Sequence, residues 1–468
     1  MHTRIFNAPA RTTHPTRDEY FSDGMTDELA HALSQLPGLR LTGRTSAFSF
    51  KGKSVSASDI GKALDVAGII EGTVRRSGDR LRVTASLTST SDGKRRWSDS
   101  YESSAKDVFT VQDELTKAMV TALAPALRGD PPAKVAEHMR GTNDAVAYDD
   151  YLKGRHFWEL RGTVNLVRAV ENFKRAIKRD PSFARAYAGL AMVYAVLPGY
   201  AGDPMDTLTT ASVLAAKQAL SLDSTLTDAK LALAYIHSVQ GRTDSAEAGF
   251  AAVIAHEPQN VTARQWHGTN ELGLGRFDEA IKELRYATSL DPLSAVVQSN
   301  LVYALFGAQQ FDAATREAAR VFDIEPDFID PSLVASYLFG GQPDSALAHL
   351  ARMQRVDSTA LCIRGMLALT YAVAGRWSEY DRIVADVKRN PGTTGAVEVG
   401  IIAMAGGDYS PLSRLLATSA GQREWSVVFL ANKCSPLLAP LRNISTVQAF
   451  VGTNCAATKW PIKPRGRR

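Results

Sequence analysis

The sequence from Ala246 to Pro258, AEAGFAAVIAHEP, returns in altered form 34 residues later from Ala280 to Pro292, AIKELRYATSLDP, and again from Ala314 to Pro326, ATREAARVFDIEP. Each copy begins at a small residue and ends at proline. Self-similarity at about this period is typical of solenoids built from helical hairpins. The small residue lets two antiparallel helices approach closely, and proline stops the second helix before the next repeat begins.

Other positions keep the same step between the alanines and the prolines. The columns are Leu233, His267 and Leu301; Ala234, Gly268 and Val302; and Phe250, Leu284 and Ala318. They resemble the tetratricopeptide repeat, and this resemblance implies an α-solenoid that binds other proteins. The regular part runs from about Leu226 to Pro326, and less regular repeats are expected on both sides of it.

The composition is that of a folded chain with several units. At 468 residues, with 45% hydrophobic and 22% charged residues, the protein should divide into two or three folding units. The net charge of +5 is modest, so a role in nucleic-acid binding would need local clustering of cations. One such cluster is Arg75, Arg76, Arg80, Arg82, Lys94, Arg95 and Arg96, and another is the basic C-terminal tail.

The region from Tyr20 to Leu127 shows a mixed pattern typical of a small α+β domain. Acids between Asp23 and Glu28 suit the first turn of a helix. Further elements are expected at Leu39 to Thr42 (strand), Arg44 to Ser46 (turn), Ser58 to Leu64 (helix), Ala67 to Arg76 and Arg80 to Ser89 (hairpin with one buried face), around Trp97 and Tyr101 (strand), and Val108 to Leu127 (helix).

Several short motifs in this region resemble the bacterial TolB-like N-terminal domain. They are Glu19 to Thr26, Arg44 to Phe48, Glu71 to Arg75, and Gln112 to Glu114. The resemblance covers roughly residues 5 to 450, and proteins of this type join the domain to tetratricopeptide repeats. It also implies an upstream serine/threonine kinase, nucleotide cyclase or winged-helix DNA-binding module. The first strand departs from the family, because only Ile5-Phe6-Asn7 remains, and we expect it to be truncated and the sheet edge to be open.

These patterns predict a mainly α fold, with a small N-terminal α+β domain followed by an α-solenoid. The expected boundaries are 1–19 for a truncated N-terminal segment, 20–128 for the TolB-like domain, 129–144 for a linker, 145–396 for the solenoid, and 397–468 for degenerate helical repeats, a C-terminal cap and the basic tail.

Targeting and redox signals are sparse. No window is apolar enough to span a bilayer, and Met1 to Pro15 lacks the apolar core of a signal peptide, so the sequence as it stands predicts a cytoplasmic protein. The alternative is a periplasmic segment of a longer, membrane-anchored protein whose upstream part is missing. Cys434 and Cys455 are expected to pair only if the chain is exported, and Cys362 is the third cysteine.

The sequence shows none of the motifs that carry common enzyme chemistry. Phosphate-binding loops, dinucleotide fingerprints, His-Glu-x-x-His zinc motifs and kinase signatures are all missing. Asp278, Glu279 and Asp312 are interpreted as acids in the first turns of helices, and His237 and His267 as packed histidines. We therefore predict no catalytic residues, no cofactor, no metal and no small-molecule substrate.

Repeat geometry then indicates which surface meets a partner, because the first helix of each repeat lines the concave face. By helical phase, the groove candidates are Arg185, Met192, Leu231, Tyr235, Gln265, Thr269, Ser299 and Tyr303. Some of them could instead pack against neighbouring helices. This set lacks the cluster of cations and asparagines that would hold a terminal carboxylate, so a peptide with apolar anchors is the expected partner.

The resulting prediction is a non-catalytic interaction scaffold, or sensory segment, of a bacterial signalling system. It would bind a protein or peptide through the concave face of the repeats. The alternative is the regulatory part of a transcription regulator that contacts nucleic acid through the basic hairpin 75–96.

Overall fold

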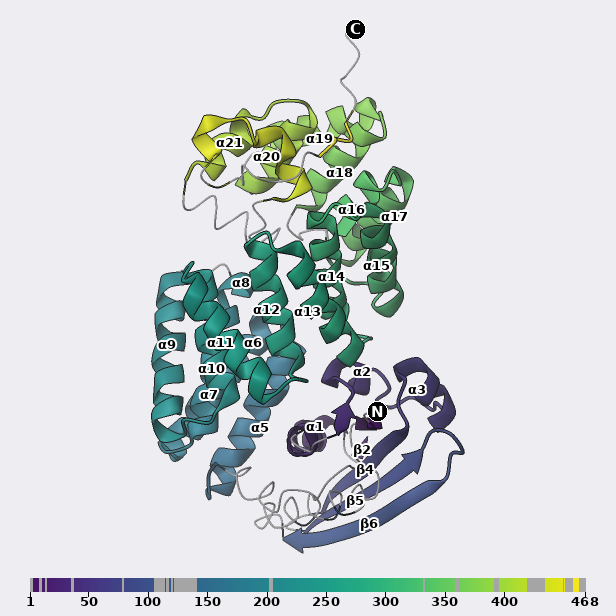
Figure 1. Ribbon diagram of the computed structural model, residues 1–468, viewed down its shortest axis with the longest axis vertical. Helices are drawn as coiled ribbons and strands as arrows, with labels where there is room; N and C mark the ends of the chain where they lie inside the picture. The colour runs from purple at the N-terminus through teal and green to yellow at the C-terminus, as the bar shows by residue number, and fades with distance from the viewer. Residues whose placement is uncertain are drawn as a thin grey trace. The chain divides into compact units, whose positions relative to one another are not determined.

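The computed structural model describes residues 3–7, 11–12, 15–34, 38–77, 80–104, 114, 118, 121, 141–201, 205–330, 333–357, 362–390, 395–418, 434–448, 450 and 458–462. The chain forms two compact units (Figure 1). Unit 1 comprises Met1–Arg264 with Leu290–Pro292, and unit 2 comprises Gln265–Ser289 with Leu293–Arg468. The N-terminal sheet therefore shares a unit with the first repeats.

A mixed sheet forms the N-terminal part of unit 1. Its strands are β1 (Thr3–Asn7), β2 (Arg11–Thr12), β3 (Leu39–Leu41), β4 (Gly68–Ser77), β5 (Arg80–Ser89) and β6 (Arg95–Ser104), in the order β3-β1-β4-β5-β6 with β2 beside β4. Strands β4, β5 and β6 are antiparallel neighbours, which confirms the predicted hairpin and the strand that follows it. Val83 and Ala85 are buried, as the alternating pattern predicts.

The first strand differs from its expected state. β1 has five residues and pairs in parallel with β3 on one side and β4 on the other. Thr3 to Ile5 pair with β3 and Ile5 to Asn7 pair with β4, so a neighbouring strand lies on each edge of β1. The prediction of an open sheet edge beside this strand is therefore wrong for the described residues, while the truncation itself stays a prediction.

The helices beside this sheet are α1 (Pro15–Ser34), α2 (Arg44–Phe48) and α3 (Ala57–Leu64). Helix α1 begins at Pro15, so the acids from Asp23 to Glu28 lie inside it and not in its first turn. The predicted turn at Arg44 to Ser46 is the short helix α2. The predicted helix from Val108 to Leu127 lies outside the described residues, apart from three helical positions, as does most of the predicted linker.

The remaining helices of unit 1 form the first repeats. They are α5 (Ala145–Leu160), α6 (Thr163–Arg179), α7 (Ala184–Val196), α8 (Pro198–Ala201), α9 (Met205–Leu222), α10 (Thr227–Val239) and α11 (Thr243–His256). Helices α5 and α6, α7 and α9, and α10 and α11 pack as pairs (Figure 1). Phe173 is fully buried where α6 meets α5 and α7, and Gly154 and Gly189 make room for its ring.

The regular repeats, from about Leu226 to Pro326, continue into unit 2. Helix α12 (Val261–Gly273) crosses the unit boundary, and α13 (Phe277–Leu290), α14 (Ala295–Gly307) and α15 (Phe311–Ile324) follow. Ala280 and Ala314 are fully buried, as the close approach of paired helices requires. Asp278, Glu279 and Asp312 lie in the first turns of α13 and α15, which confirms their predicted places.

The less regular repeats beyond Pro326 also form helix pairs. They are α16 (Val334–Phe339) with α17 (Pro343–Val356), α18 (Ile363–Val373) with α19 (Trp377–Arg389), and α20 (Ala396–Ala405) with α21 (Ser410–Leu416), followed by the 3₁₀ helices η5 (Pro436–Leu441) and η6 (Ser445–Val447). Their buried apolar side chains join one core with those of α14 and α15.

Several of the turns between paired helices contain a glycine with a positive φ angle. Gly241, Gly275, Gly341 and Gly375 adopt positive φ angles, which glycine does without a steric cost. Gln309 occupies the turn one period after Gly275 and also has a positive φ of 60°. A side chain with a Cβ is strained in this region, so Gln309 departs from the glycine that these four turns use, as Arg161 with a φ of 52° does in the turn between α5 and α6.

The packing around Phe173 gives a test of the repeat core. In Gly189→Ala the new Cβ would lie 2.5 Å from Phe173 Cζ, and this buried ring has no free space to enter. We expect the free energy of unfolding to fall by about 1–3 kcal/mol in chemical denaturation followed by circular dichroism. Gly273→Ala is the matched control, since nothing lies within 4 Å of its added Cβ. Equal effects of the two changes would contradict this account of the core.

Candidate functional site

The acids of α1 form the centre of a buried ionic interface within unit 1. Asp23 and Glu28 are each only 3% exposed, and both face helices of the first repeats. Glu28 accepts hydrogen bonds at both carboxylate oxygens from Arg185 on α7, at 2.6 and 2.7 Å. A two-point pair of this kind fixes orientation as well as distance, so it sets how α1 lies against the repeat.

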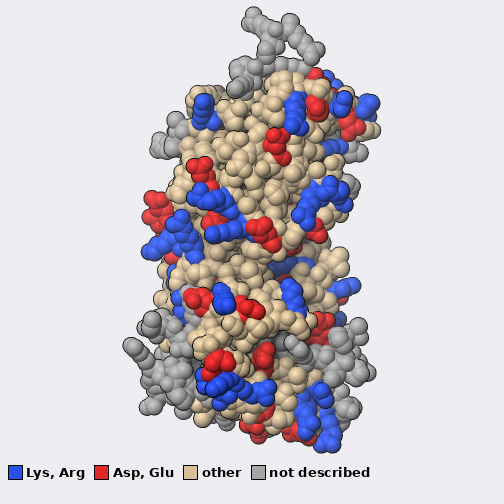
Figure 2. All heavy atoms as spheres, turned by 90° about the vertical axis from the view of Figure 1, so that its right-hand side faces the viewer, with Lys and Arg blue, Asp and Glu red and all other residues tan. Residues whose placement is uncertain are grey.

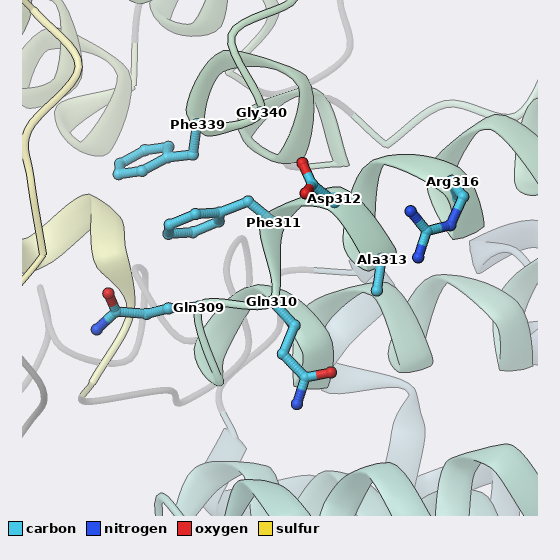
Figure 3. Close-up of a pocket in the computed structure, with 8 residues that line it drawn as sticks. All are labelled: Gln309, Gln310, Phe311, Asp312, Ala313, Arg316, Phe339 and Gly340. Atoms are coloured by element: carbon cyan, nitrogen blue, oxygen red, sulfur yellow. The ribbon is translucent and has the colours of Figure 1, made fainter.

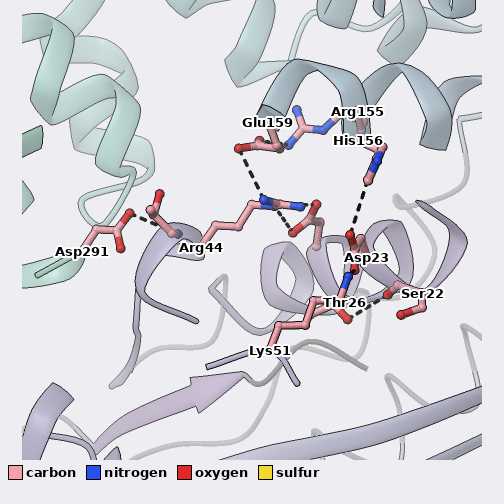
Figure 4. Close-up of polar contacts among 11 residues, drawn as sticks. Ser22, Asp23, Thr26, Arg44, Lys51, Arg155, His156, Glu159 and Asp291 are labelled. Atoms are coloured by element: carbon pink, nitrogen blue, oxygen red, sulfur yellow. Dashed lines mark hydrogen bonds and ion pairs between the residues drawn. The ribbon is translucent and has the colours of Figure 1, made fainter. Parts of the chain in front are cut away.

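A second group of charges surrounds Arg44 on α2 (Figure 4). Arg44 Nε donates to both carboxylate oxygens of Asp27 at 2.8 and 2.9 Å, and Arg44 Nη1 lies 3.9 Å from Glu159 Oε2 on α5. Arg155, one turn earlier on α5, lies 3.8 Å from Glu159 and 3.1 Å from Asp228 on α10. Cations and anions therefore alternate from α1 to α10, and the charges compensate one another.

The third contact involves Asp23. Lys51 Nζ lies 2.6 Å from Asp23 Oδ1, and His156 Nδ1 on α5 lies 3.4 Å from Asp23 Oδ2 (Figure 4). Gly24 follows, and an added Cβ there would lie 2.7 Å from a methyl carbon of Leu152 on α5. Glycine at this position thus permits the close approach of α1 and α5.

Residues that follow helices α11 and α13 bind the segment from β3 to α2. The side chain of Gln259, just after Pro258, donates to the Leu39 carbonyl at 2.6 Å. Asp291, just before Pro292, accepts from the amide of Ser46 at 2.7 Å and from its hydroxyl (Figure 4). Gly43 allows this contact, since a Cβ would lie 2.4 Å from the Cβ of Asp291. Asp291 therefore caps the N-terminus of α2, while Gln259 binds the main chain of β3.

The electrostatics of the interface follow from burial and pairing. Although burial opposes its ionisation, the Arg185 guanidinium holds the pKa of Glu28 below its ordinary value. Burial raises the pKa of Asp27 to about 6, and the nearby negative charge of Glu159 adds to this effect while Arg44 opposes it. The pKa of Glu159 is lowered, because Arg44 and Arg155 outweigh the cost of its burial. Of Asp27, Glu28 and Glu159, Asp27 is therefore the carboxylate that takes up a proton first as pH falls.

This interface joins two parts of the chain within unit 1. Its charges are engaged with one another, and the described residues contain no group of three His, Cys, Asp or Glu side chains placed to hold a metal. Two of the motifs that resemble the TolB-like domain, Glu19 to Thr26 and Arg44 to Phe48, supply residues to it. Sequence reasoning missed this role, although acids inside an apolar helical pattern were a visible signal.

The predicted groove residues fall into two groups. In unit 1, Leu231 and Met192 are buried, Arg185 is held by Glu28, and Tyr235 is half-buried. In unit 2, Ser299 is buried and Gln265, Thr269 and Tyr303 are half-buried, with the Tyr303 hydroxyl donating to Asp330. The half-buried residues remain the candidates for contact with a partner, while the buried ones pack inside the repeats. The groove assignment stays a prediction.

A pocket of about 430 Å³ lies at the turn between α14 and α15 in unit 2 (Figure 3). Its lining residues are Gln309, Gln310, Phe311, Asp312, Ala313, Arg316, Phe339 and Gly340. Figure 3 shows the rings of Phe311 and Phe339 one above the other, pointing to the same side as Gln309. None of these residues was among the predicted groove candidates.

The basic hairpin carries acids as well as arginines. Arg80 and Arg82 both pair with Glu102 on β6, and Arg96 pairs with Asp92. On the face shown in Figure 2, lysines and arginines likewise lie beside aspartates and glutamates. Pairing of this kind weakens the field that a nucleic-acid phosphate would meet.

Comparisons with known proteins support the repeat architecture. Residues 267–326 match the tetratricopeptide repeat family, so the chain carries tetratricopeptide repeats. A protein of Rhizobium meliloti (strain 1021) named "Putative adenylate cyclase 3" is 30% identical over 230 residues, which is 49% of this chain and 39% of the relative. The chain thus spans well under half the length of that relative.

Solved structures of low sequence identity also resemble parts of the chain. A tetratricopeptide repeat protein from Parabacteroides merdae is 14% identical, with a TM-score of 0.38 over 56% of this chain and 99% of its own. PilF from Pseudomonas aeruginosa is 17% identical, with a TM-score of 0.37 over 46% of this chain and 95% of its own.

The Glu28–Arg185 pair gives the first test of the interface. Glu28→Gln leaves a buried guanidinium without its counter-charge, so we expect the free energy of unfolding of unit 1 to fall by about 3–5 kcal/mol. The exposed pair of Arg352 and Asp327 is the control, and Asp327→Asn should cost less than about 1 kcal/mol. Chemical denaturation measures both, and similar losses would show that the buried pair does not fix the interface.

Asp27 gives a second test, through pH. Its folded pKa of about 6 lies above its ordinary value of 3.8, so between these values the folded state binds a proton that the unfolded state has lost. Asp27 therefore stabilises the fold less as pH rises from about 4 to about 6. We expect the difference in unfolding free energy between the wild type and Asp27→Asn to fall by up to about 3 kcal/mol across this window. A difference that does not change with pH would contradict the raised pKa.

Proposed function

We propose that this chain is a non-catalytic sensory or scaffold segment of a bacterial signalling system. Its repeats hold a protein or peptide on their concave face, and its N-terminal domain responds as part of the same body. Stacked helical hairpins provide an extended surface suited to this work, because neighbouring repeats add contacts without changing the fold.

The observation that carries the proposal is the buried ionic interface of unit 1. It joins α1 and α2 to α5, α7 and α10 through paired charges that are costly to separate once out of water. A partner that binds beside α7 and α10 therefore acts on a body that includes the sheet. This arrangement supports transmission of partner binding to whatever adjoins the N-terminal domain.

The resemblance to the Rhizobium meliloti protein supports a signalling context. In our proposal the repeats and the N-terminal domain report to an effector such as a nucleotide cyclase or a protein kinase, in cis or in trans. The chain itself performs no catalysis in this scheme. The nucleic-acid alternative has less support, because three arginines of the hairpin are paired with acids.

The concave face can be tested at its half-buried tyrosines. Tyr235→Ala removes an aromatic candidate of unit 1 and Tyr303→Ala one of unit 2, and with both changes we expect at least tenfold weaker capture of the partner in pull-downs read by mass spectrometry. Helical circular dichroism should stay unchanged. Leu214→Ala is the control, because Leu214 is 64% exposed on α9 outside the proposed groove. Unaltered capture by the double variant would remove the groove assignment.

We also propose that the segment works in an oxidising compartment, such as the periplasm. Cys434 is disulfide-bonded and Cys362 is a buried free thiol, while Cys455 lies outside the described residues. Disulfides persist in exported proteins and are rare in the cytosol. Among the described residues, no helix is long and apolar enough to cross a bilayer.

A thiol count in cells tests the compartment. Protein from intact cells, denatured and treated with a polyethylene-glycol maleimide, should gain one modification without reductant and three after reduction, given its three cysteines. Three modifications without reductant would place the chain in a reducing compartment. The Cys434→Ser variant provides the reference for a chain that cannot form this bond.

A further inference from the structure

An aromatic cluster in unit 2 lies at the turn between α14 and α15 and the end of α16. Phe306 and Phe311 have ring centroids 5.7 Å apart, and Phe339 lies 5.2 Å from each of them. Phe306 is buried, whereas Phe311 and Phe339 are half-buried and line the pocket drawn in Figure 3. The cluster thus has one face in the core and one face toward the pocket.

A segment from the far end of the chain lies on this cluster. Trp460 meets Phe339 edge to face, with ring centroids 6.0 Å apart and the planes at 74°. Trp460 and Ile462 are partly buried against the core of unit 2, and Pro461 between them forms no helix or strand. Residues 458–462 therefore supply an aromatic-proline-aliphatic sequence, outside any helix or strand, that contacts the pocket residue Phe339.

The pocket wall contains the strained turn residue. The equivalent turns at Gly241 and Gly275 are glycines, whereas Gln309 carries a side chain at a φ of 60°. Holding a glutamine in this conformation costs about 1 kcal/mol or more. Gln309 and Gln310 together present carboxamides, which can both donate to and accept from a peptide main chain.

We propose that this pocket is a binding site for an extended peptide that contains an aromatic residue followed by proline, and that the segment 458–462 occupies its edge as an internal ligand. Proline favours an extended conformation that loses little entropy on binding, and aromatic side chains pack well against such peptides. A partner with the same sequence chemistry competes with the internal segment for Phe339. The rim carries both Asp312 and Arg316, so it selects for shape more than for charge.

This site is separate from the proposed concave groove. The pocket belongs to the turns between paired helices, and it shares no residue with the groove candidates. Failure of the tyrosine test would leave the pocket proposal standing, and the reverse also holds. The two surfaces could serve different partners of one scaffold.

The experiment uses full-length protein and a labelled peptide. A fluorescein-labelled peptide with the sequence of residues 458–468 is titrated with wild type and with Trp460→Ala, and binding is read by fluorescence anisotropy. Because the internal segment competes in the wild type, we expect Trp460→Ala to bind the peptide about tenfold or more tightly. Trp377→Ala is the matched control, since Trp377 packs on Tyr380 elsewhere in unit 2 and should bind as the wild type does.

A second set of variants tests the pocket wall in the Trp460→Ala background. Gln309→Gly removes the carboxamide and relieves the turn, so it should weaken peptide binding about fivefold while stability is kept or increased. Phe339→Leu should weaken binding further, and the peptide with alanine in place of tryptophan should bind poorly. If Trp460→Ala fails to fold by circular dichroism, Trp460→Leu takes its place with the same expected direction.

Three results would overturn the proposal. Equal peptide affinity in the wild type and the Trp460 variant would show that the segment does not compete. Binding that is indifferent to both Gln309→Gly and Phe339→Leu would place the peptide elsewhere. A wild-type dimer in light scattering that Trp460→Ala converts to monomer would assign the segment to a second copy of the chain.

Discussion

The carboxylate of Glu28, buried against the guanidinium of Arg185, constrains how α1 lies against α7 in unit 1. Removing two charges from water costs several kcal/mol each, and the pair recovers this only when both hydrogen bonds are well formed. With bonds of 2.6 and 2.7 Å, α1 has one favourable position against α7. The charges around Arg44 and Asp23 meet the same requirement on α5, so the N-terminal domain and the first repeats hold one relative orientation.

The residues around Pro258 and Pro292 also help to fix the N-terminal domain against the repeats. Helices α11 and α13 end shortly before Pro258 and Pro292, as proline requires. Next to these prolines, Gln259 binds the main chain of β3 and Asp291 binds that of α2. The residues that end the second helices of the regular repeats thus also bind the N-terminal domain. The proposed sensory role depends on this double use, since partner binding on the repeats can reach the sheet only through a stiff connection.

The proposed pocket lies where one repeat departs from the regular pattern of its neighbours. The glycine turns obey a local steric rule, and Gln309 breaks it beside a pocket lined by two half-buried phenylalanines. Sequences that break a local rule commonly do so at functional sites, because the strain must be offset by some other gain. The segment around Trp460 packs on Phe339 of the pocket. In our proposal it defines the ligand chemistry of this site as an aromatic residue followed by proline.

The sequence by itself determined the repeat period, the helix pairs with their small and proline positions, the hairpin of β4 and β5, and the acids in the first turns of α13 and α15. All of these follow from local periodicity and local capping, which a single sequence displays. It did not predict that α1 begins at Pro15, that Arg44 to Ser46 is helical, or that β1 pairs on both edges. Nor did local pattern separate buried Leu231 and Met192 from half-buried Tyr235, because burial depends on the neighbouring helix.

Only the tertiary structure decided what the acids of α1 do. Glu28 and Arg185 are 157 residues apart, and Ser46 and Asp291 are 245 apart, so no local rule could pair them. Taken alone, Asp23, Asp27 and Glu28 resemble any acids near a helix start. Their meaning comes from cations that folding brings from distant helices, since a carboxylate can be buried only where a partner compensates its charge.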